Sequence, residues 1–451
     1  MDILYIQEVE MENNESAIEA KDFNQQGIAL FKSGNYEEAA KKYDKAIEID
    51  PMVMESYINY GNLYLKTGQY QKAKNYYKKA LLFEKNGEVY FHYGNACFMN
   101  DEPGEGLEYY NLAISAGFNN DEMLFFMGMA YENMDDNGMA LRYYTKAIQK
   151  NHMRPEYKVK KIETMIKLNM MDEVKKSIDE LIMEEPELFD GYHLKTLILI
   201  EDNDYEKAAE FAKSASERFP SDTDLLYDYA RAVSLTGRLD DAIKIIENAK
   251  KLKFFDESKD RFSLLECEIY ATGGEYDKAL SKSEECLKLI NDDAVLANIR
   301  FMRINMLIEK EKYEEALKDA DEIINSSDRG SFYYAALYYK PFCYKKLGRK
   351  NEADREYKNS ITLYRLATLQ NPDAVDAYMY RAMCLRDIEK FDEAIDMLEL
   401  MENVNNGLAE IHTIKADIYK IMGKEVLYKE EINKAYEIKP ELKNVINEGG
   451  D

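Results

Sequence analysis

The sequence predicts an all-α solenoid in which about twelve antiparallel helix pairs stack along the chain. Three observations lead to this fold class: a small residue that returns at a near-constant interval, glycines that interrupt helical patterns, and a composition of 46% apolar and 32% charged residues. The apolar share can form a core, whereas the charge exceeds what a compact globule of this length needs on its surface. An elongated array with a large surface accounts for both.

One helix pair can be read from residues 54–85. The first helix carries apolar and small residues at the spacing of one helical face, namely Tyr57, Tyr60, Gly61 and Tyr64. Gly68 then favours a helix end, because glycine accepts the left-handed conformation there. A second helix shows the same spacing at Ala73, Tyr77 and Ala80. Helices joined by so short a turn lie antiparallel, and the small residues let their backbones approach.

The position of Ala73 recurs along the whole chain. The interval is 34 residues, once 33, up to Ala242, and then 37, 37, 37, 41 and 34. Ten of the twelve positions hold Ala or Gly; the full set is Ala39, Ala73, Gly106, Ala140, Val174, Ala208, Ala242, Ala279, Ala316, Ala353, Ala394 and Tyr428. Glycine recurs in the turn position as Gly34, Gly68, Gly237, Gly274, Gly348 and Gly423.

These intervals divide the chain into four parts. We expect an N-terminal extension at 1–19, repeats one to seven at 20–250, repeats eight to twelve with a longer period at 251–440, and a tail at 441–451. The largest insertion, between Ser360 and Tyr378, predicts a second helix longer by about two turns. Pro341 lies inside a predicted helix, where the missing N–H should bend it.

At this point the sequence resembles the tetratricopeptide repeat family. The resemblance rests on residues 34–39, GNYEEA, and 43–51, YDKAIEIDP, and extends from about Ala20 to Pro440. It implies a right-handed superhelix whose first helices line a concave groove, and partner binding rather than one particular activity. The charged clamp of the family's chaperone-tail adaptors is not matched, because the corresponding positions hold Asn24, Ile28, Asn59, Glu88 and His92.

Charge and composition exclude several classes of partner. The net charge of −26 repels nucleic-acid backbones and anionic lipid, so we expect neither nucleic acid nor membrane as a partner. The N-terminus has no basic flank of the kind that a secretory signal carries, and apolar runs as short as Leu197–Ile200 cannot span a bilayer. We therefore expect a cytoplasmic protein. Its oligomeric state stays open.

Catalytic and metal-binding motifs are missing from the sequence. The four histidines fall in separate repeats, and the five cysteines form no Cys-x-x-Cys pair. No glycine-rich phosphate loop or nucleophile motif occurs. We expect no enzymatic activity, no metal and no cofactor.

Candidate binding residues lie on the first helices, facing away from the second. In repeats two to four they are Asn59, Asn62, Phe91, His92, Asn95, Phe125, Phe126 and Met129. Amides can pair with the backbone of an extended peptide, and aromatic rings supply contact area at low entropic cost. The alternative, at even odds, is that the Phe and Met side chains fill gaps between repeats.

Two further features carry weaker predictions. One is a cluster in repeats nine to eleven that consists of Phe301, Asn305, Tyr338, Phe342, Met379 and Met383. It predicts either an adaptable binding surface or packing between repeats, and packing is favoured about two to one. A basic stretch could seat an acidic peptide, but a solvated helix face is favoured about three to one: Lys150, Arg154, Lys158, Lys160, Lys161, Lys167, Lys175 and Lys176.

The sequence therefore predicts a scaffold or adaptor that binds a protein or peptide in its groove. The alternative is a peptide-sensing regulator whose superhelix changes pitch when the ligand binds. From sequence alone, we expect the double substitution Asn62→Ala/Phe91→Ala to abolish partner capture without changing the melting temperature.

Overall fold

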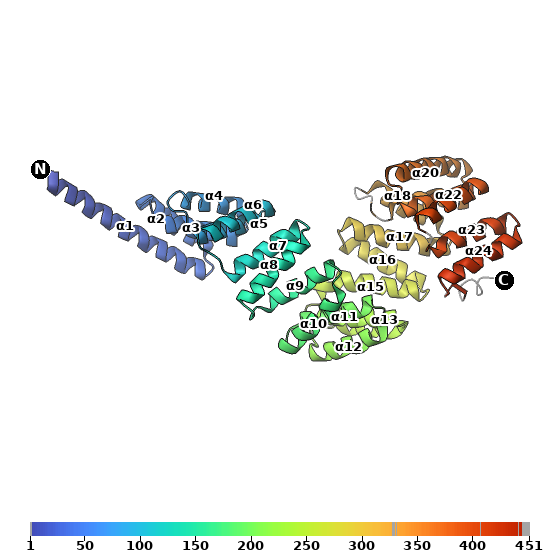
Figure 1. The fold of residues 1–451 in the computed structure, drawn as a ribbon, viewed down its shortest axis with the longest axis horizontal. Helices are drawn as coiled ribbons and strands as arrows, with labels where there is room; N and C mark the ends of the chain where they lie inside the picture. The colour runs from blue at the N-terminus through green and yellow to red at the C-terminus, as the bar shows by residue number, and fades with distance from the viewer. Residues whose placement is uncertain (1, 327–329, 331, 406, 441, 444–451) are drawn as a thin grey trace. The chain divides into compact units, whose positions relative to one another are not determined.

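The computed structural model describes residues 2–326, 330, 332–405, 407–440 and 442–443, with side chains from residue 16 onward. These residues form 24 α-helices and one short 3₁₀ helix, and none of them lies in a strand (Figure 1). The all-α fold class is thus confirmed. The chain divides into two compact units, residues 1–204 and 205–451.

The first unit consists of eleven helices along the part of the chain that the structure describes. They are α1 (Asp2–Lys32), α2 (Tyr36–Ile49), α3 (Met54–Lys66), α4 (Tyr70–Ala80), α5 (Gly87–Met99), α6 (Pro103–Ser115), α7 (Asp121–Asn133), α8 (Asn137–Lys150), α9 (Pro155–Lys167), α10 (Met171–Glu184) and α11 (Phe189–Glu201). Helix α1 begins well before the first expected repeat, so residues 2–19 continue into the first repeat as one helix.

The second unit begins with α12 and includes the 3₁₀ helix η1. Its elements are α12 (Tyr205–Arg218), α13 (Thr223–Leu235), α14 (Leu239–Ala249), η1 (Phe255–Ser258), α15 (Lys259–Thr272), α16 (Tyr276–Leu289), α17 (Asp293–Glu309), α18 (Tyr313–Asn325), α19 (Tyr333–Lys346), α20 (Lys350–Gln370), α21 (Val375–Asp387), α22 (Phe391–Val404), α23 (Ala409–Ile421) and α24 (Glu425–Ile438).

The turn within each helix pair uses one residue in the left-handed conformation. All six glycines predicted for this position have a positive φ, between 68° and 84°. In the other six pairs a polar residue takes the same conformation, and these are Asp101, Asp135, Asn169, Asn203, Glu311 and Glu389. Asn and Asp tolerate this region better than most residues, which accounts for four of these turns, and a glutamate takes the position in the other two.

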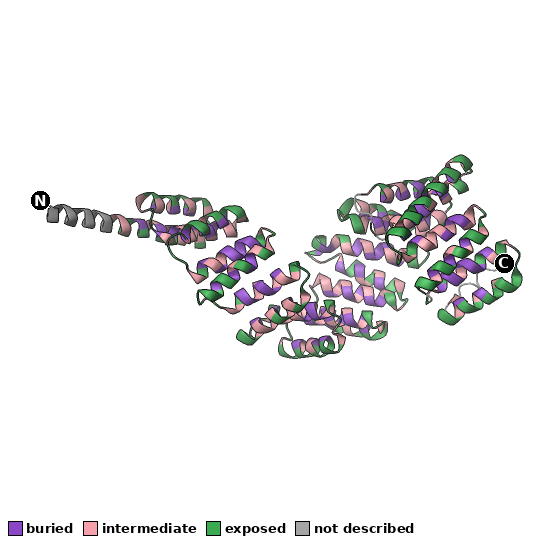
Figure 2. Ribbon diagram, turned by 45° about the horizontal axis from the view of Figure 1, so that its top comes forward, coloured by how far each residue is buried: buried purple, intermediate pink, exposed green. Residues whose placement is uncertain are grey.

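Small residues meet a facing helix as the sequence predicts. Eleven of the twelve recurring positions are buried, the exception being the half-buried Tyr428, and buried residues run as stripes along the paired helices (Figure 2). In four pairs, a glycine of the first helix lies under a tyrosine ring sixteen residues later. A Cβ built on Gly61 would lie 2.4 Å from the ring of Tyr77. Only glycine fits beneath this ring.

The insertions in the second unit lengthen helices and one loop. Helix α20 has 21 residues against 13 in α18, which confirms the predicted extra two turns. Helix α19 runs on through the buried Pro341. The carbonyl of Leu337, which a residue with an N–H at 341 would engage, instead accepts a 2.7 Å hydrogen bond from the Ser360 hydroxyl of α20.

Candidate functional site

The candidate residues of repeats two to four lie on first helices that contact one another. Helix α1 contacts α3, α3 contacts α5, and α5 contacts α7. A side-chain hydrogen bond joins the first two of these helices, because the Asn59 amide donates to the Asn24 amide oxygen at 3.0 Å. The structure therefore brings Asn59, Asn62 and the candidates of α5 and α7 onto neighbouring helices of one unit.

Asn62 and His92 are connected through Tyr77. The Tyr77 hydroxyl donates to the Asn62 amide oxygen at 2.7 Å, and the His92 imidazole stacks on the Tyr77 ring with centroids 6.0 Å apart. Tyr77 itself is fully buried above Gly61. Because the amide oxygen of Asn62 accepts from tyrosine, its amide nitrogen is left to donate to another group. Both Asn62 and His92 are half-buried.

The imidazole of His92 is uncharged at neutral pH. Burial lowers its pKa below the usual value, although the Glu88 carboxylate, 3.9 Å from Nε2, opposes this shift. A neutral imidazole offers one donor and one acceptor. His92 can therefore pair with either group of a peptide backbone.

Two candidates on α5 are more buried than a contact surface requires. Phe91 is 4% exposed and stacks on Phe118 at 5.4 Å, and Asn95 is 7% exposed and accepts a 2.8 Å hydrogen bond from the Tyr110 hydroxyl. Phe91→Ala would therefore create a core cavity that costs about 3–5 kcal/mol. This corrects the expectation that Asn62→Ala/Phe91→Ala leaves melting unchanged.

The three candidates of α7 are half-buried and line the same row of helices. The ring of Phe125 stacks on that of Tyr157 with centroids 4.6 Å apart, and the ring centroids of Phe126 and Phe91 are 6.3 Å apart. Met129 packs against the same core cluster. Each keeps part of its surface free. Packing between repeats and contact with a partner are both compatible with this degree of exposure.

The second aromatic and methionine cluster is largely engaged in packing. Phe301 stacks on Phe332 at 4.8 Å, and the Asn305 amide bonds back to its own helix at the Phe301 carbonyl. Tyr338 is 3% exposed and hydrogen-bonds to Asp387, beside the half-buried Phe342. Met379 and Met383 are also half-buried, against the core of α21 and α22. Apart from Tyr338 these residues are half-buried, so packing between repeats and contact with a partner are both compatible with their exposure.

Six of the eight cations of the basic stretch are paired with neighbouring carboxylates. Lys158 pairs with Glu184 at 2.7 Å, and pairs of the same kind hold Lys160, Lys167, Lys175, Lys176 and Arg154. This is the arrangement of a charged helix face rather than of an acidic-peptide site.

One group of side chains has the spacing of metal ligands. Ligand atoms of Cys97, Glu102 and Glu105 lie within 4.8 Å of one another. The Lys74 ammonium, however, pairs with both carboxylates, at 2.8 Å for Glu105, and burial raises the pKa of Cys97 to about 12. A cation would have to displace Lys74 and deprotonate a buried thiol, so the group fits an ion-pair cluster better than a metal site.

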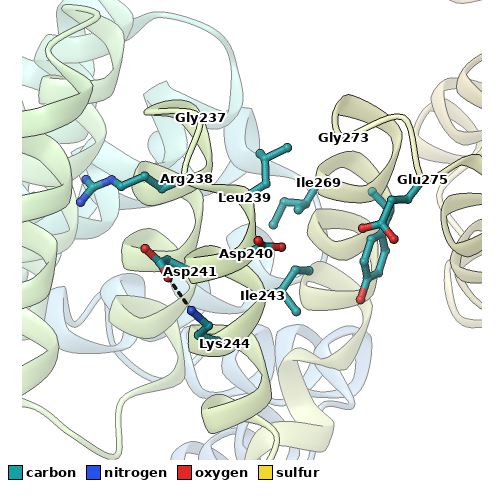
Figure 3. Close-up of a pocket in the computed structure, with 11 residues that line it drawn as sticks. Gly237, Arg238, Leu239, Asp240, Asp241, Ile243, Lys244, Ile269, Gly273 and Glu275 are labelled. Atoms are coloured by element: carbon teal, nitrogen blue, oxygen red, sulfur yellow. Dashed lines mark hydrogen bonds and ion pairs between the residues drawn. The ribbon is translucent and has the colours of Figure 1, made fainter.

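Two surface hollows of the second unit are not lined by the predicted residues. One, of about 450 Å³, lies between α14 and α15 and is lined by Leu239, Ile243 and Ile269 beside the ion pair of Asp241 with Lys244 (Figure 3). Another, of about 610 Å³, lies beside Tyr357 and Asp387. None of the described helices is long and apolar enough to cross a membrane.

The connection through Tyr77 is the part of this candidate site that the sequence did not predict. The sequence does contain a pattern that indicates this connection, because a tyrosine follows a glycine by sixteen residues in four repeats. The pairs are Gly27/Tyr43, Gly61/Tyr77, Gly94/Tyr110 and Gly128/Tyr144. In two of these pairs, an asparagine directly after the glycine binds the tyrosine hydroxyl.

Comparisons with known proteins agree with the helix pairs. Family models described as tetratricopeptide repeat match residues 54–86, 121–149, 199–258 and 346–402, and a TPR repeat model matches residues 27–68. Human DnaJ homolog subfamily C member 7 is 19% identical over 336 residues, which cover 69% of this chain and 68% of that protein.

Two further similarities cover different shares of the chain. Mouse DnaJ homolog subfamily C member 3 is 26% identical over 294 residues, which cover 60% of this chain and 56% of that protein. The crystal structure of yeast Tom70 is similar with a TM-score of 0.44 and 15% identity, over 94% of this chain and 96% of that one.

Proposed function

The chain is a tetratricopeptide repeat protein, and we propose that it is a non-enzymatic scaffold that binds an extended protein segment on the first helices of its first unit. We define the binding face by the half-buried residues of α3, α5 and α7 that can reach a ligand: Asn59, Asn62, His92, Phe125, Phe126 and Met129. Phe91 and Asn95 support this face from the core.

The linked side chains of Asn62, Tyr77 and His92 carry this proposal. Tyr77 is fixed by burial, and its hydrogen bond holds the Asn62 amide in one orientation, with the nitrogen as the remaining donor. A donor fixed in this way loses little entropy when a peptide carbonyl binds. His92 adds an uncharged donor and acceptor one repeat further along.

The apolar part of the face would provide contact area. Phe125, Phe126 and Met129 each keep part of their surface free while their neighbours hold them in place. Burying the rest of such side chains gains about 25 cal/mol per Å² of apolar surface. The face thus combines backbone recognition by Asn62 and His92 with apolar contacts, which suits an extended segment.

Peptide-library selection tests the proposal with a variant that keeps the fold. Asn62→Asp retains an oxygen for the Tyr77 hydroxyl but removes the amide donor, and His92→Phe retains the ring stack but removes the ring nitrogens. We expect the wild-type chain to select peptides whose affinity falls at least about tenfold in Asn62→Asp/His92→Phe, since two hydrogen bonds are lost.

Asn111→Asp on α6 is the matched control, because this residue is exposed and lies outside the binding face. It introduces the same charge as Asn62→Asp and should leave the affinity unchanged. Selected peptides that bind the double variant as tightly as the wild type would refute the assignment of the binding face.

A further inference from the structure

The second helix of repeat two carries a local excess of positive charge. Residues 66–85 contain six lysines and one glutamate, a net charge of +5 in a chain of −26. Lys74 is buried and paired with Glu102 and Glu105. Three others, Lys72, Lys78 and Lys79, are exposed on the outer face of α4. We call Lys72, Asn75, Tyr76, Lys78, Lys79 and Leu82 the lysine face.

The exposed lysines of this face have no carboxylate partner among the residues that the structure describes. Lys72 donates to the Gln69 amide at 2.8 Å and lies 5.3 Å from the centroid of Tyr64, while Lys79 lies 4.7 Å from the centroid of Tyr76. In the basic stretch around Lys158, by contrast, six of the eight cations are paired with carboxylates.

The lysine face is also concave and partly apolar. Its six residues line a hollow of about 440 Å³. Leu82, at one end, is 81% exposed, and Tyr76 forms a half-buried aromatic wall. Lys72, Lys79 and Leu82 follow one another at helical spacing over about 15 Å, a length that four or five extended residues can span.

We propose that the lysine face docks a short acidic segment of another protein that carries one apolar side chain. Its carboxylates would pair with Lys72, Lys78 and Lys79, and its apolar side chain would cover Leu82. This surface is separate from the binding face around Asn62 and goes beyond the proposed function.

Charge favours a short segment over larger anionic partners. The rest of the chain is strongly acidic and repels anions. This repulsion is weak at distances beyond the Debye length of about 8–10 Å. A short segment can confine its contacts to the lysine face. A second copy of the chain, or a flat anionic membrane, would bring many more negative charges towards the acidic remainder.

Binding of a labelled peptide in which Glu alternates with Leu tests the proposal by fluorescence anisotropy. We expect this peptide to bind, and its counterpart with Gln in place of Glu to bind at least tenfold more weakly. Lys72→Gln/Lys78→Gln/Lys79→Gln should weaken the acidic peptide at least tenfold, and Leu82→Ser should weaken it further. Raising the salt concentration from about 0.1 M to about 1 M shortens the Debye length from about 10 Å to about 3 Å. This should markedly weaken binding of the acidic peptide to the wild-type chain, but not to the triple lysine variant.

Lys41→Gln/Lys176→Gln/Lys213→Gln is the matched control, since it removes three exposed lysines that have carboxylate neighbours elsewhere. It should leave the affinity unchanged, as should Asn62→Asp/His92→Phe, which separates this surface from the binding face. Equal loss in the control triple, or equal binding of the Gln peptide, would overturn the proposal. The proposal would also be overturned if Lys72→Gln/Lys78→Gln/Lys79→Gln bound the acidic peptide normally and instead lost only binding to phosphatidylserine vesicles, or only self-association measured by sedimentation.

Discussion

Placing a methyl group on Gly61 should have opposite effects depending on the residue at position 77. In the wild-type chain, the added Cβ would lie 2.4, 2.7 and 2.8 Å from three ring carbons of Tyr77. Carbon atoms pack at about 3.5–4.0 Å, so the ring must move by about 1 Å. Tyr77 is fully buried and its hydroxyl is bonded to Asn62, so this movement disturbs both the packing and the hydrogen bond.

The two effects of Gly61→Ala can be compared in magnitude. Overpacking costs about 1–3 kcal/mol, and a strained hydrogen bond adds about 1 kcal/mol. The higher helix propensity of alanine offsets about 1 kcal/mol of this destabilisation. The net destabilisation is therefore about 1–3 kcal/mol. In a Tyr77→Ala background, which itself costs about 3–5 kcal/mol, the ring is gone and Gly61→Ala should stabilise by about 1 kcal/mol.

Native-state hydrogen exchange of the α3 and α4 amides is the appropriate assay, since a long repeat array need not unfold in one step. Gly104→Ala on α6 is the control, because a Cβ there meets nothing within 4 Å and should be harmless. Additive effects of Gly61→Ala and Tyr77→Ala would refute the account of how the two helices fit together.

Three further predictions concern the second unit. Ser360→Ala leaves the buried Leu337 carbonyl without a partner and should lower the free energy of unfolding by about 1–3 kcal/mol. The loss should be smaller in a Pro341→Ala background, because the backbone N–H of residue 341 can then donate to this carbonyl. Urea unfolding, followed by hydrogen exchange of the α19 amides, measures both effects. Asp387→Ala deprives Tyr338, Tyr357 and Arg386 of a shared acceptor, and a loss of about 3–5 kcal/mol is expected in the same assay. Burial opposes ionisation of Glu431, yet hydrogen bonds from Lys434 and His412 hold its pKa below the usual 4.5. Because this folded-state pKa is depressed, the stabilisation is present above about pH 4.5 and is lost as pH falls through the folded value. The lower melting temperature of Glu431→Gln at pH 7 should therefore converge on the wild type below that range, and a pH-independent difference would contradict the ion-pair account.

The recurring small residues predicted the helix pairs because packing leaves them little freedom. Ala39 and Ala73 contact facing helices, where a larger side chain would force the backbones apart. The turns were only half visible in the sequence, since Asp101 and Glu311 replace glycine in the same conformation. Helix α1 extends beyond the expected repeat boundary, because a helix continues where no residue stops it.

The binding residues could be predicted only in part. Helical periodicity placed Asn62 and His92 on first helices, but it could not distinguish the buried Phe91 from the half-buried Phe126. That difference depends on side chains from other helices, such as Phe118. The lysine face was missed because its charges are diluted in an acidic chain, and only the structure shows which lysines lack carboxylates.

Site-specific photo-cross-linking tests the proposed binding face most directly. A benzophenone amino acid at position 129 on α7 would report on the first-helix face, and the same group at position 111 on α6 would report on a second helix. With peptides selected by the full-length chain, we expect cross-links at 129 but not at 111, and their loss in Asn62→Asp/His92→Phe. Cross-links at 111 alone, or equal yields at both positions in the wild type and the variant, would contradict binding on the first helices.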